Sequence, residues 1–153
     1  MGLKGKMIGQ TEIKGAGGDV FHEVFRQRPH HLANMSPEKV HGFTLLGGGL
    51  GTVGSVIQWD YTHDGKERVA KQFIENIDEE KQSVRFKMIE GDLMDLYKTF
   101  IITYHVDKRV DYNLVTWTFE YEKLNENIPH PGTLLSLFLH VVEDIEAHHI
   151  KKA

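Results

Sequence analysis

The sequence predicts an α+β fold in which one curved antiparallel sheet of about seven strands packs against a long C-terminal helix. Three observations predict it. Runs of alternating apolar and polar residues fill most of the chain, turn signals separate these runs, and one apolar stripe at helical spacing lies near the C-terminus. Parallel strands need long crossover connections, usually helices, and none separates the later runs. The strands are therefore expected to be antiparallel.

The N-terminal part of the chain predicts a strand from Leu3 to Ile13, followed by two short helices. Asp19 can cap the first helix, Pro29 ends it, and its apolar face consists of Phe21, Val24 and Phe25. In Ser36-Pro37-Glu38 a capping residue precedes a proline, which is typical of a helix start. We expect Gly42 to end this second helix.

The middle of the chain predicts further strands joined by tight turns. Asp64-Gly65 is a strong hairpin signal, and Asp78-Glu79-Glu80 supplies another turn. The side chains of each strand are expected to alternate between a buried and a wet face. The predicted strands are Val53–Tyr61, Lys66–Ile77, Val84–Met88, Phe100–Val106 and Val115–Tyr121.

The C-terminal segment predicts one long helix from about Pro131 to Lys151. Its apolar residues recur at i, i+3, i+4, i+7 and i+11, which places them in a single stripe. At roughly 1.5 Å per residue the helix is about 30 Å long, enough to cross a small domain. The stripe consists of Leu134, Leu137, Phe138, Val141 and Ile145.

The composition predicts a single globular domain spanning residues 1–153, because the chain is 40% hydrophobic and 26% charged. The formal net charge of −4 argues against a protein that binds nucleic acid. The absence of Cys excludes disulfides and thiolate metal sites. No secretory core follows Met1, and the most apolar run, Leu134–Val142, is far shorter than the ~20 residues of a membrane-spanning helix. We expect a soluble, cytoplasmic protein without an integral membrane segment.

The residues expected to face the helix are unusually aromatic. Because a helix is only about 10 Å wide, a strongly bent sheet wrapped around it can leave interior space unfilled. Natural interiors are close-packed, so a large unfilled space indicates a ligand site. The inward-facing set consists of Phe43, Trp59, Phe86, Phe100, Tyr104, Trp117 and Phe119.

A glycine-rich segment, Gly47–Gly54, matches the GxGxxG spacing of nucleotide-binding loops. A dinucleotide site requires a helix after these glycines, whereas Val53–Tyr61 alternates as a strand. The catalytic-loop motifs of kinases are absent as well. We interpret the segment as a turn between strands or as an entrance loop to an interior site, formed by Gly47, Gly49 and Gly51.

Ten histidines raise the question of a metal site. In the pairs His30-His31 and His148-His149 neighbouring helical side chains point about 100° apart, so neither pair chelates alone. Glu143 or Asp144 with His148 would still need a third ligand. We therefore expect neither a metal nor another cofactor. Inward polar side chains that could serve acid–base catalysis are few. They are Tyr61, Tyr104 and Tyr121, with Lys71 as a fourth if its strand phase, which the sequence does not fix, turns it inward.

Several segments resemble the major latex protein branch of the Bet v 1-like plant proteins. Lys87–Met94 contains an Ile-Glu-Gly step that is typical of the wider family. Further matching segments follow one another over nearly the whole chain: Pro29-His30-His31 with Ser36-Pro37, Trp59-Asp60-Tyr61 with Asp64-Gly65, Trp117–Asn127, and Asp144–His149. The resemblance implies a helix-grip, START-like fold with seven strands, two short helices after the first strand, and a long helix across a large cavity.

The resemblance also implies a function. Relatives bind steroids, cytokinins, flavonoids or fatty acids, and the branch is associated with plant defence and stress. The norcoclaurine-synthase type uses an inward Lys, whereas the corresponding inward positions here are Val115, Trp117 and Phe119. The gate-loop motifs of the hormone-receptor type are also missing.

We therefore expect an intracellular carrier of small hydrophobic ligands that performs no chemistry. Tyr104, or else Lys71 or His105, would orient the ligand through a polar contact. Two alternatives stay open: a condensing or cyclising enzyme, and a ligand-gated interaction module that uses the glycine-rich segment to bind a protein partner. The expected ligand-binding residues are Phe21, Phe25, Trp59, Phe86, Met88, Phe100, Tyr104, Trp117, Leu134, Leu137, Phe138 and Val141.

Overall fold

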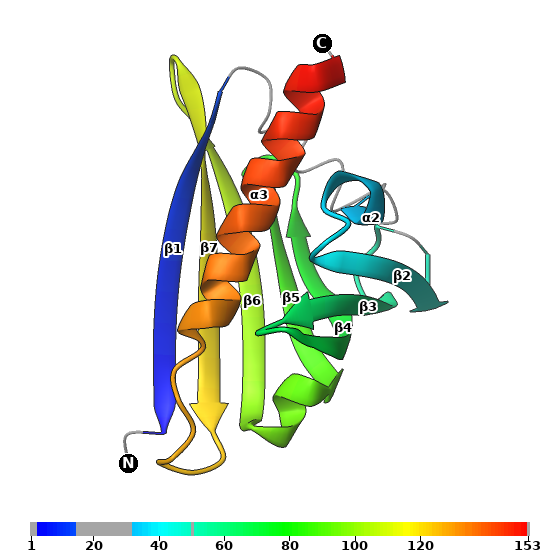
Figure 1. Cartoon of the computed structure of the whole chain (residues 1–153), viewed down its shortest axis with the longest axis vertical. Coiled ribbons are helices and arrows are strands. Elements are labelled where there is room, and N and C mark those ends of the chain that lie inside the picture. The colour runs from blue at the N-terminus through cyan, green and yellow to red at the C-terminus, as the bar shows by residue number, and fades with distance from the viewer. Residues whose placement is uncertain (1–2, 15–31, 50, 153) are drawn as a thin grey trace.

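The computed structural model describes residues 3–14, 32–49 and 51–152 (Figure 1). The predicted first strand and C-terminal helix are both present, each shifted by one residue. In chain order the elements are β1 (Lys4–Lys14), α2 (Leu32–Met35), β2 (Val40–Gly47), β3 (Val56–His63), β4 (Lys66–Asp78), β5 (Ser83–Gly91), the 3-10 helix η2 (Asp92–Asp95), β6 (Tyr97–Lys108), β7 (Tyr112–Lys123) and α3 (Gly132–Lys152).

The strands of the described chain form one antiparallel sheet in the order β1-β7-β6-β5-β4-β3-β2. From β2 to β7 each strand pairs with the next one along the chain. The first strand instead pairs with the last, with Lys4 opposite Glu122. The prediction of an antiparallel sheet is confirmed, and β1 and β2 are its two edges.

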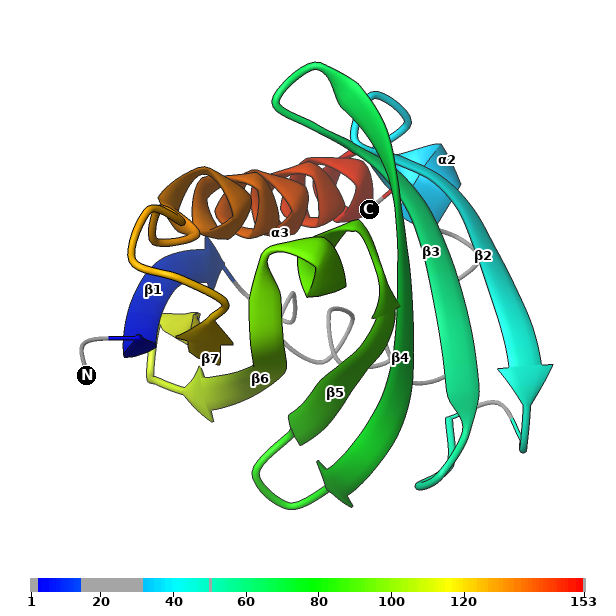
Figure 2. The ribbon, with the colours of Figure 1, turned by 90° about the horizontal axis from the view of Figure 1, so that it is seen from below.

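The sheet is strongly curved, and α3 lies along its concave face. In Figure 2 the sheet curves around α3, from β1 on one side, past β6 and β5, to β4, β3 and β2 on the other. This arrangement confirms the helix-grip fold class. It also places the two edge strands on opposite sides of the helix, so that the interior lies between α3 and the middle of the sheet.

Alternation along the strands decides which side chains face the helix. In β7 the buried residues Val115, Trp117 and Phe119 alternate with the half-buried Thr116 and Thr118. In β6 and β5 the predicted inward residues Phe100, Tyr104 and Phe86 are at most 3% exposed. The ring of Phe43 on β2 packs edge-on against that of Trp59 on β3, 4.9 Å apart, and both are half-buried.

The predicted hairpin at Asp64-Gly65 is confirmed. Asp64 and Gly65 have φ angles of 53° and 75°, which is the left-handed conformation that a two-residue hairpin turn requires at both positions. His63 and Lys66 therefore face each other across the turn. This tight connection fixes the register of β3 against β4 and so sets which of their residues face α3.

Gly91, at the end of β5, explains the Ile-Glu-Gly step. Its φ of 121° lies in the region that favours glycine, and a Cβ atom there would overlap the carbonyl oxygen of Val69 on β4. The pairing of β4 with β5 shifts register between Lys71 and Gln72, close to this point. Glycine is required because two backbones approach each other too closely for any side chain.

The prediction of a helix from Ser36 to Gly42 is wrong. The short helix α2 ends at Met35, residues 36–39 form a turn, and the chain then enters β2. The predicted strand ranges had left out β2 altogether. The other predicted short helix, which includes Phe21 and Phe25, lies outside the described residues.

Long-range contacts override the local helix signal at Ser36. Its hydroxyl does not cap a helix but donates a hydrogen bond to the Asp144 carboxylate on α3, 2.6 Å away. From Val40 onward the backbone pairs with β3, with Val40 opposite Tyr61. Pairing along one edge of β3, together with the contact to α3, outweighs the few hydrogen bonds of a short helix.

The glycine-rich segment connects β2 to β3. The amide of Gly54 donates a hydrogen bond to the carbonyl of Ile74, so the segment is attached to β4. A strand follows it, as predicted, although this strand begins at Val56. The role of Gly47, Gly49 and Gly51 as an entrance loop stays a prediction.

Candidate functional site

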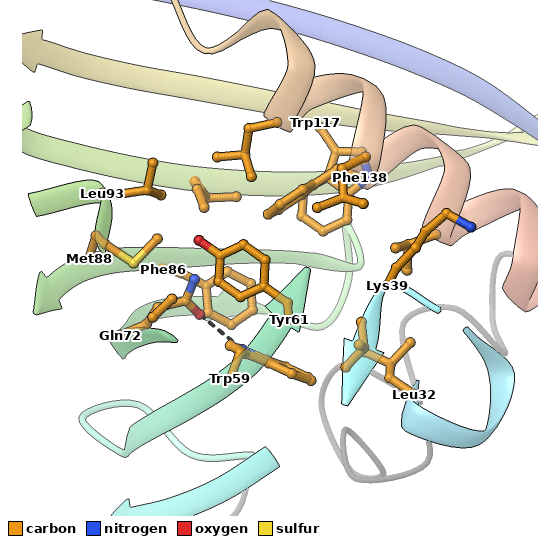
Figure 3. Close-up of a pocket in the computed structure, with 16 residues that line it drawn as sticks. Leu32, Lys39, Trp59, Tyr61, Gln72, Phe86, Met88, Leu93, Trp117 and Phe138 are labelled. Atoms are coloured by element: carbon orange, nitrogen blue, oxygen red, sulfur yellow. Dashed lines mark hydrogen bonds between the residues drawn. The ribbon is translucent and has the colours of Figure 1, made fainter. Parts of the chain in front are cut away.

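A cavity of about 80 Å³ lies between α3 and the concave face of the sheet (Figure 3). One water molecule takes up roughly 30 Å³ in the liquid, so this space exceeds an ordinary packing defect. The side chains of the described residues leave this part of the interior unfilled. The described lining consists of Leu32, Lys39, Val40, Trp59, Tyr61, Ala70, Gln72, Phe86, Met88, Leu93, Ile102, Trp117, Leu134, Leu137, Phe138 and Val141.

Three neighbouring strands each supply two residues to one wall. Side chains two residues apart on a strand point to the same face, and the hairpin registers bring the three pairs side by side. The pairs are Trp59 and Tyr61 on β3, Ala70 and Gln72 on β4, and Phe86 and Met88 on β5.

The opposite wall is one face of α3. Its four lining residues follow the i, i+3, i+4, i+7 spacing of a helix face: Leu134, Leu137, Phe138 and Val141. Leu134 and Val141 are buried, whereas Leu137 and Phe138 are half-buried. Trp59 and Lys39 across the cavity are also half-buried, so solvent reaches this part of the wall.

Edge-on ring contacts fix the aromatic part of the lining. The ring of Phe138 lies 4.7 Å from that of Trp117 at an interplanar angle of 83°, and 5.2 Å from that of Phe119. Trp117 in turn contacts Tyr104 at 5.6 Å. Such edge-to-face pairs favour one ring orientation, so the wall has a defined shape.

The structure brings most of the predicted ligand-binding residues together around the cavity: Trp59, Phe86, Met88, Trp117, Leu134, Leu137, Phe138 and Val141. Phe100 and Tyr104 are fully buried but are not part of the described lining. Phe100 instead packs against Tyr97 and Tyr121. Phe21 and Phe25 lie outside the described residues. The assignment of these residues to ligand binding remains a proposal.

Sequence reasoning missed several lining residues. Leu32 and Lys39 reach the cavity only because α2 and the following turn fold against α3, which no local pattern indicates. Val40 belongs to the strand that was not predicted. Leu93 follows the close backbone approach at Gly91, and the remaining missed residues are Ala70, Gln72 and Ile102. Tyr61, by contrast, was expected to face inward.

Two polar side chains, Gln72 and Tyr61, stand out in this mainly apolar lining. The Gln72 carbonyl oxygen accepts a hydrogen bond from the indole nitrogen of Trp59, 3.2 Å away. Burial, followed by the nearby Asp92 carboxylate, raises the pKa of Tyr61 to about 12, with Arg68 opposing the shift. The phenol of Tyr61 is therefore protonated, and able to donate a hydrogen bond, throughout the neutral pH range.

An ion pair joins the turn before β2 to α3 beside the cavity. The Lys39 ammonium lies 2.7 Å from the Asp144 carboxylate, which also accepts a hydrogen bond from the Ser36 hydroxyl. Burial alone would raise the pKa of Asp144, but the hydrogen bonds from Lys39 and Ser36, with a further contribution from His140, hold it below its usual value. The stem of Lys39 thus lines the cavity while its charge is neutralised at the rim.

The other candidates for a polar contact with a ligand lie elsewhere. Lys71 alternates with the buried Ala70 and Gln72, and its ammonium pairs with Glu90 at 3.1 Å. Because neighbouring residues of a strand point to opposite faces, Lys71 lies on the outer face of the sheet. His105, next to the buried Tyr104, likewise alternates away from the interior.

Among the described residues, no group of His, Asp and Glu side chains is arranged to hold a metal ion. Within the same part of the chain, no helix is both long and apolar enough to cross a membrane.

The curved sheet, the enclosed helix and the apolar cavity between them define a helix-grip protein with an interior site. Comparison with known sequences gives the family. The chain belongs to the pathogenesis-related protein Bet v 1 family, whose sequence profile matches residues 2–152. This is a ligand-binding fold.

Individual relatives place the chain close to the major latex proteins. It is 42% identical over 148 residues to MLP-like protein 43 of Arabidopsis thaliana, covering 95% of this chain and 93% of that one. The crystal structure of major latex-like protein 151 from Panax ginseng superimposes with a TM-score of 0.92 at 48% identity, covering 97% and 99% of the two chains. Norcoclaurine synthase from Thalictrum flavum shares the fold, with a TM-score of 0.72, at 18% identity over 96% of each chain.

Proposed function

We propose that this protein is an intracellular carrier that binds small hydrophobic ligands in the cavity between α3 and the sheet. The observation that carries the proposal is a cavity with almost wholly apolar walls at the centre of a ligand-binding fold. Ligands of the sterol, flavonoid, hormone or fatty-acid type all present the apolar surface that such walls accept.

Desolvation supplies the affinity in this proposal. Burying about 300 Å² of apolar ligand surface at ~25 cal/mol per Å² yields roughly 7 kcal/mol before the costs of association. The cavity of about 80 Å³ is smaller than an engineered cavity of roughly 150 Å³ that binds benzene. A sterol-sized ligand therefore requires the half-buried wall residues, such as Phe138 and Trp59, to move outward.

The proposal is binding without chemistry. General acid–base catalysis works best with a group whose pKa lies near the working pH. The phenol of Tyr61, with a pKa of about 12, does not meet that condition, and the inward positions Val115, Trp117 and Phe119 of β7 are apolar. A turnover assay with aldehyde and amine pairs tests the alternative of a condensing enzyme, and product formation above the uncatalysed rate would support it.

A cytoplasmic location and a role in plant defence or stress belong to the same proposal. The description of the family as pathogenesis-related supports the second of these. Cell fractionation and measurement of the protein's abundance after infection test the two separately.

Native mass spectrometry of protein purified from its own source tests the binding function directly. We expect a copurified small molecule, lost on denaturation. Both tryptophans of the chain, Trp59 and Trp117, line the cavity, so titration with a sterol, a flavonoid and a fatty acid should change the intrinsic fluorescence. If nothing copurifies and none of the three ligands alters the emission, the carrier function is wrong.

A further inference from the structure

Two polar side chains are buried in the mainly apolar wall of the cavity. Tyr61 on β3 is 8% exposed and Gln72 on the neighbouring β4 is 5% exposed, and both belong to the lining. In Figure 3 the Tyr61 hydroxyl and the Gln72 amide project toward the same part of the cavity, on the side of Met88. Two hydrogen-bonding groups thus converge where apolar contact alone would favour leucine or phenylalanine.

Each of these two side chains has a hydrogen-bond donor that is not used within the described part of the chain. Gln72 uses its carbonyl oxygen for Trp59, which leaves its amide nitrogen with two hydrogens. Within the part of the chain that the structure describes, neither this nitrogen nor the Tyr61 hydroxyl has a hydrogen-bonding partner. More than nine in ten buried polar groups in proteins do have one, and leaving a group without one costs free energy. A bound molecule with an acceptor atom would satisfy both donors.

The electrostatics of the described walls favour a neutral partner. The one ammonium in the lining, that of Lys39, is held by Asp144 at 2.7 Å. Burial and the Asp92 carboxylate, which together outweigh Arg68 and raise the pKa of Tyr61, would likewise oppose a second negative charge beside it. A carboxylate head group is therefore disfavoured at this point, whereas a carbonyl oxygen accepts hydrogen bonds without carrying a charge.

From this arrangement we infer that Tyr61 and Gln72 form a recognition pair that donates two hydrogen bonds to one acceptor oxygen of a neutral, otherwise apolar ligand. The ligand class is thereby narrowed to neutral oxygenated molecules such as ketones, with the oxygen on the β3–β4 side and the apolar body toward α3. The inference rests on the proposed binding function, and it assigns to Tyr61 and Gln72 the orienting contact expected from Tyr104.

Two ligands of the same shape test this pair. Cyclohexanone and methylenecyclohexane differ only in whether a C=O or a C=CH₂ group projects from the ring. Their dissociation constants are measured by NMR titration with the wild-type protein and with Tyr61→Phe. Comparing the ratio of the two constants between proteins cancels the difference in hydration of the free ligands. Tyr97→Phe is the matched control, because it removes a hydroxyl that donates to the Pro129 carbonyl outside the cavity.

We expect Tyr61→Phe to raise the dissociation constant of cyclohexanone about tenfold, which is the effect of one lost neutral hydrogen bond. The dissociation constant of methylenecyclohexane should change by less than about twofold. Tyr97→Phe should change neither constant. If Tyr61→Phe weakens both ligands equally or neither, the recognition pair is wrong while the binding function stands. If the wild-type protein binds neither ligand, the proposed function itself is overturned.

A second variant isolates the contribution of Gln72. Gln72→Met removes the amide nitrogen but also the acceptor for Trp59, so Trp59→Phe, which loses the same internal hydrogen bond, is its control. The ratio of the cyclohexanone constant to the methylenecyclohexane constant should rise several-fold in Gln72→Met and clearly less in Trp59→Phe, in which Gln72 keeps its amide nitrogen. An equal rise in both variants would show that Gln72 only positions Trp59, which contradicts the inference.

Discussion

Phe138 offers the sharpest test of the cavity, because its ring lines the cavity and is itself half-buried. Its side chain lines the cavity from α3 and packs edge-on against Trp117 and Phe119. Phe138→Ala removes the ring and both aromatic contacts, and merges the vacated volume with the cavity of about 80 Å³. The variant should therefore lose stability and gain capacity for apolar ligands at the same time.

The expected loss of stability follows from this geometry. Phe-to-Ala changes in protein cores cost about 3–5 kcal/mol, and the partial exposure of Phe138 argues for the lower end, about 3 kcal/mol. Domains of this size have unfolding free energies of about 5–15 kcal/mol, so the variant stays folded. A ligand such as benzene, present at about 100 times its dissociation constant, restores about 2.7 kcal/mol if it fills the space.

Urea denaturation, followed by tryptophan fluorescence with and without benzene, measures both effects. Leu135→Ala is the matched control, since Leu135 lies on the same helix, is 7% exposed, and faces Gly9 on β1 rather than the cavity. It should lose about 2–5 kcal/mol. Benzene should stabilise Phe138→Ala beyond its effect on the wild-type protein, and should not do so for Leu135→Ala. Equal stabilisation of the two variants, or none, would refute the reasoning.

Two further predictions concern single positions. Gly91→Ala should prevent folding or lower the free energy of unfolding by several kcal/mol, because the new Cβ would overlap the Val69 carbonyl. Gly54→Ala, where φ is 87° and the space around the position is open, should lower it by only about 1–2 kcal/mol. Thermal unfolding compares the two variants, and equal losses of stability would contradict the steric account. The pKa of Asp144 is lowered on folding, so its stabilisation is complete above about pH 4 and is lost as the pH falls through the folded-state pKa. Asp144→Asn should be about 1 kcal/mol less stable than wild type at pH 7, and this difference should shrink as the pH falls below about 4. A difference that does not depend on pH would show that the Lys39 pairing is not the cause.

The fold could be predicted where one strand face is buried and the other wet. The alternation through β7 and through Phe100–Val106 of β6 gave the inward faces correctly, because every second residue there is buried. The edge strand β2 has no such pattern: Leu45 and Leu46 are 39% and 48% exposed, and only Val40 is fully buried. A strand with apolar residues on both faces and paired on one side only produces no period of two.

The sequence did not show which residues of β4 face the interior, and for this reason the polar part of the cavity could not be predicted. Apolar residues occur on both faces of this strand, with Val69 exposed and Ala70 buried next to it. Register shifts at Lys71–Gln72 and Ile74–Asn76 interrupt the pairing with β5. Without a regular phase, Lys71 and Gln72 could not be told apart from sequence, and the structure places Gln72 inside.

The position of a residue along an inward-facing strand decides whether it meets the cavity or the solid core. On β7, Trp117 lines the cavity, whereas Tyr121, four residues further on, packs against Tyr97 and Phe100 at ring distances of 5.5 and 5.8 Å. Periodicity reveals the face but not this position, which is why Phe100 was expected in the site. Local stability is therefore highest at the end of the interior where the rings pack closely. At the cavity end, wall residues such as Phe138 are only half-buried. For this reason, variants with substitutions in the cavity wall should still fold while their ligand affinity changes. Every binding test of this site depends on such folded variants.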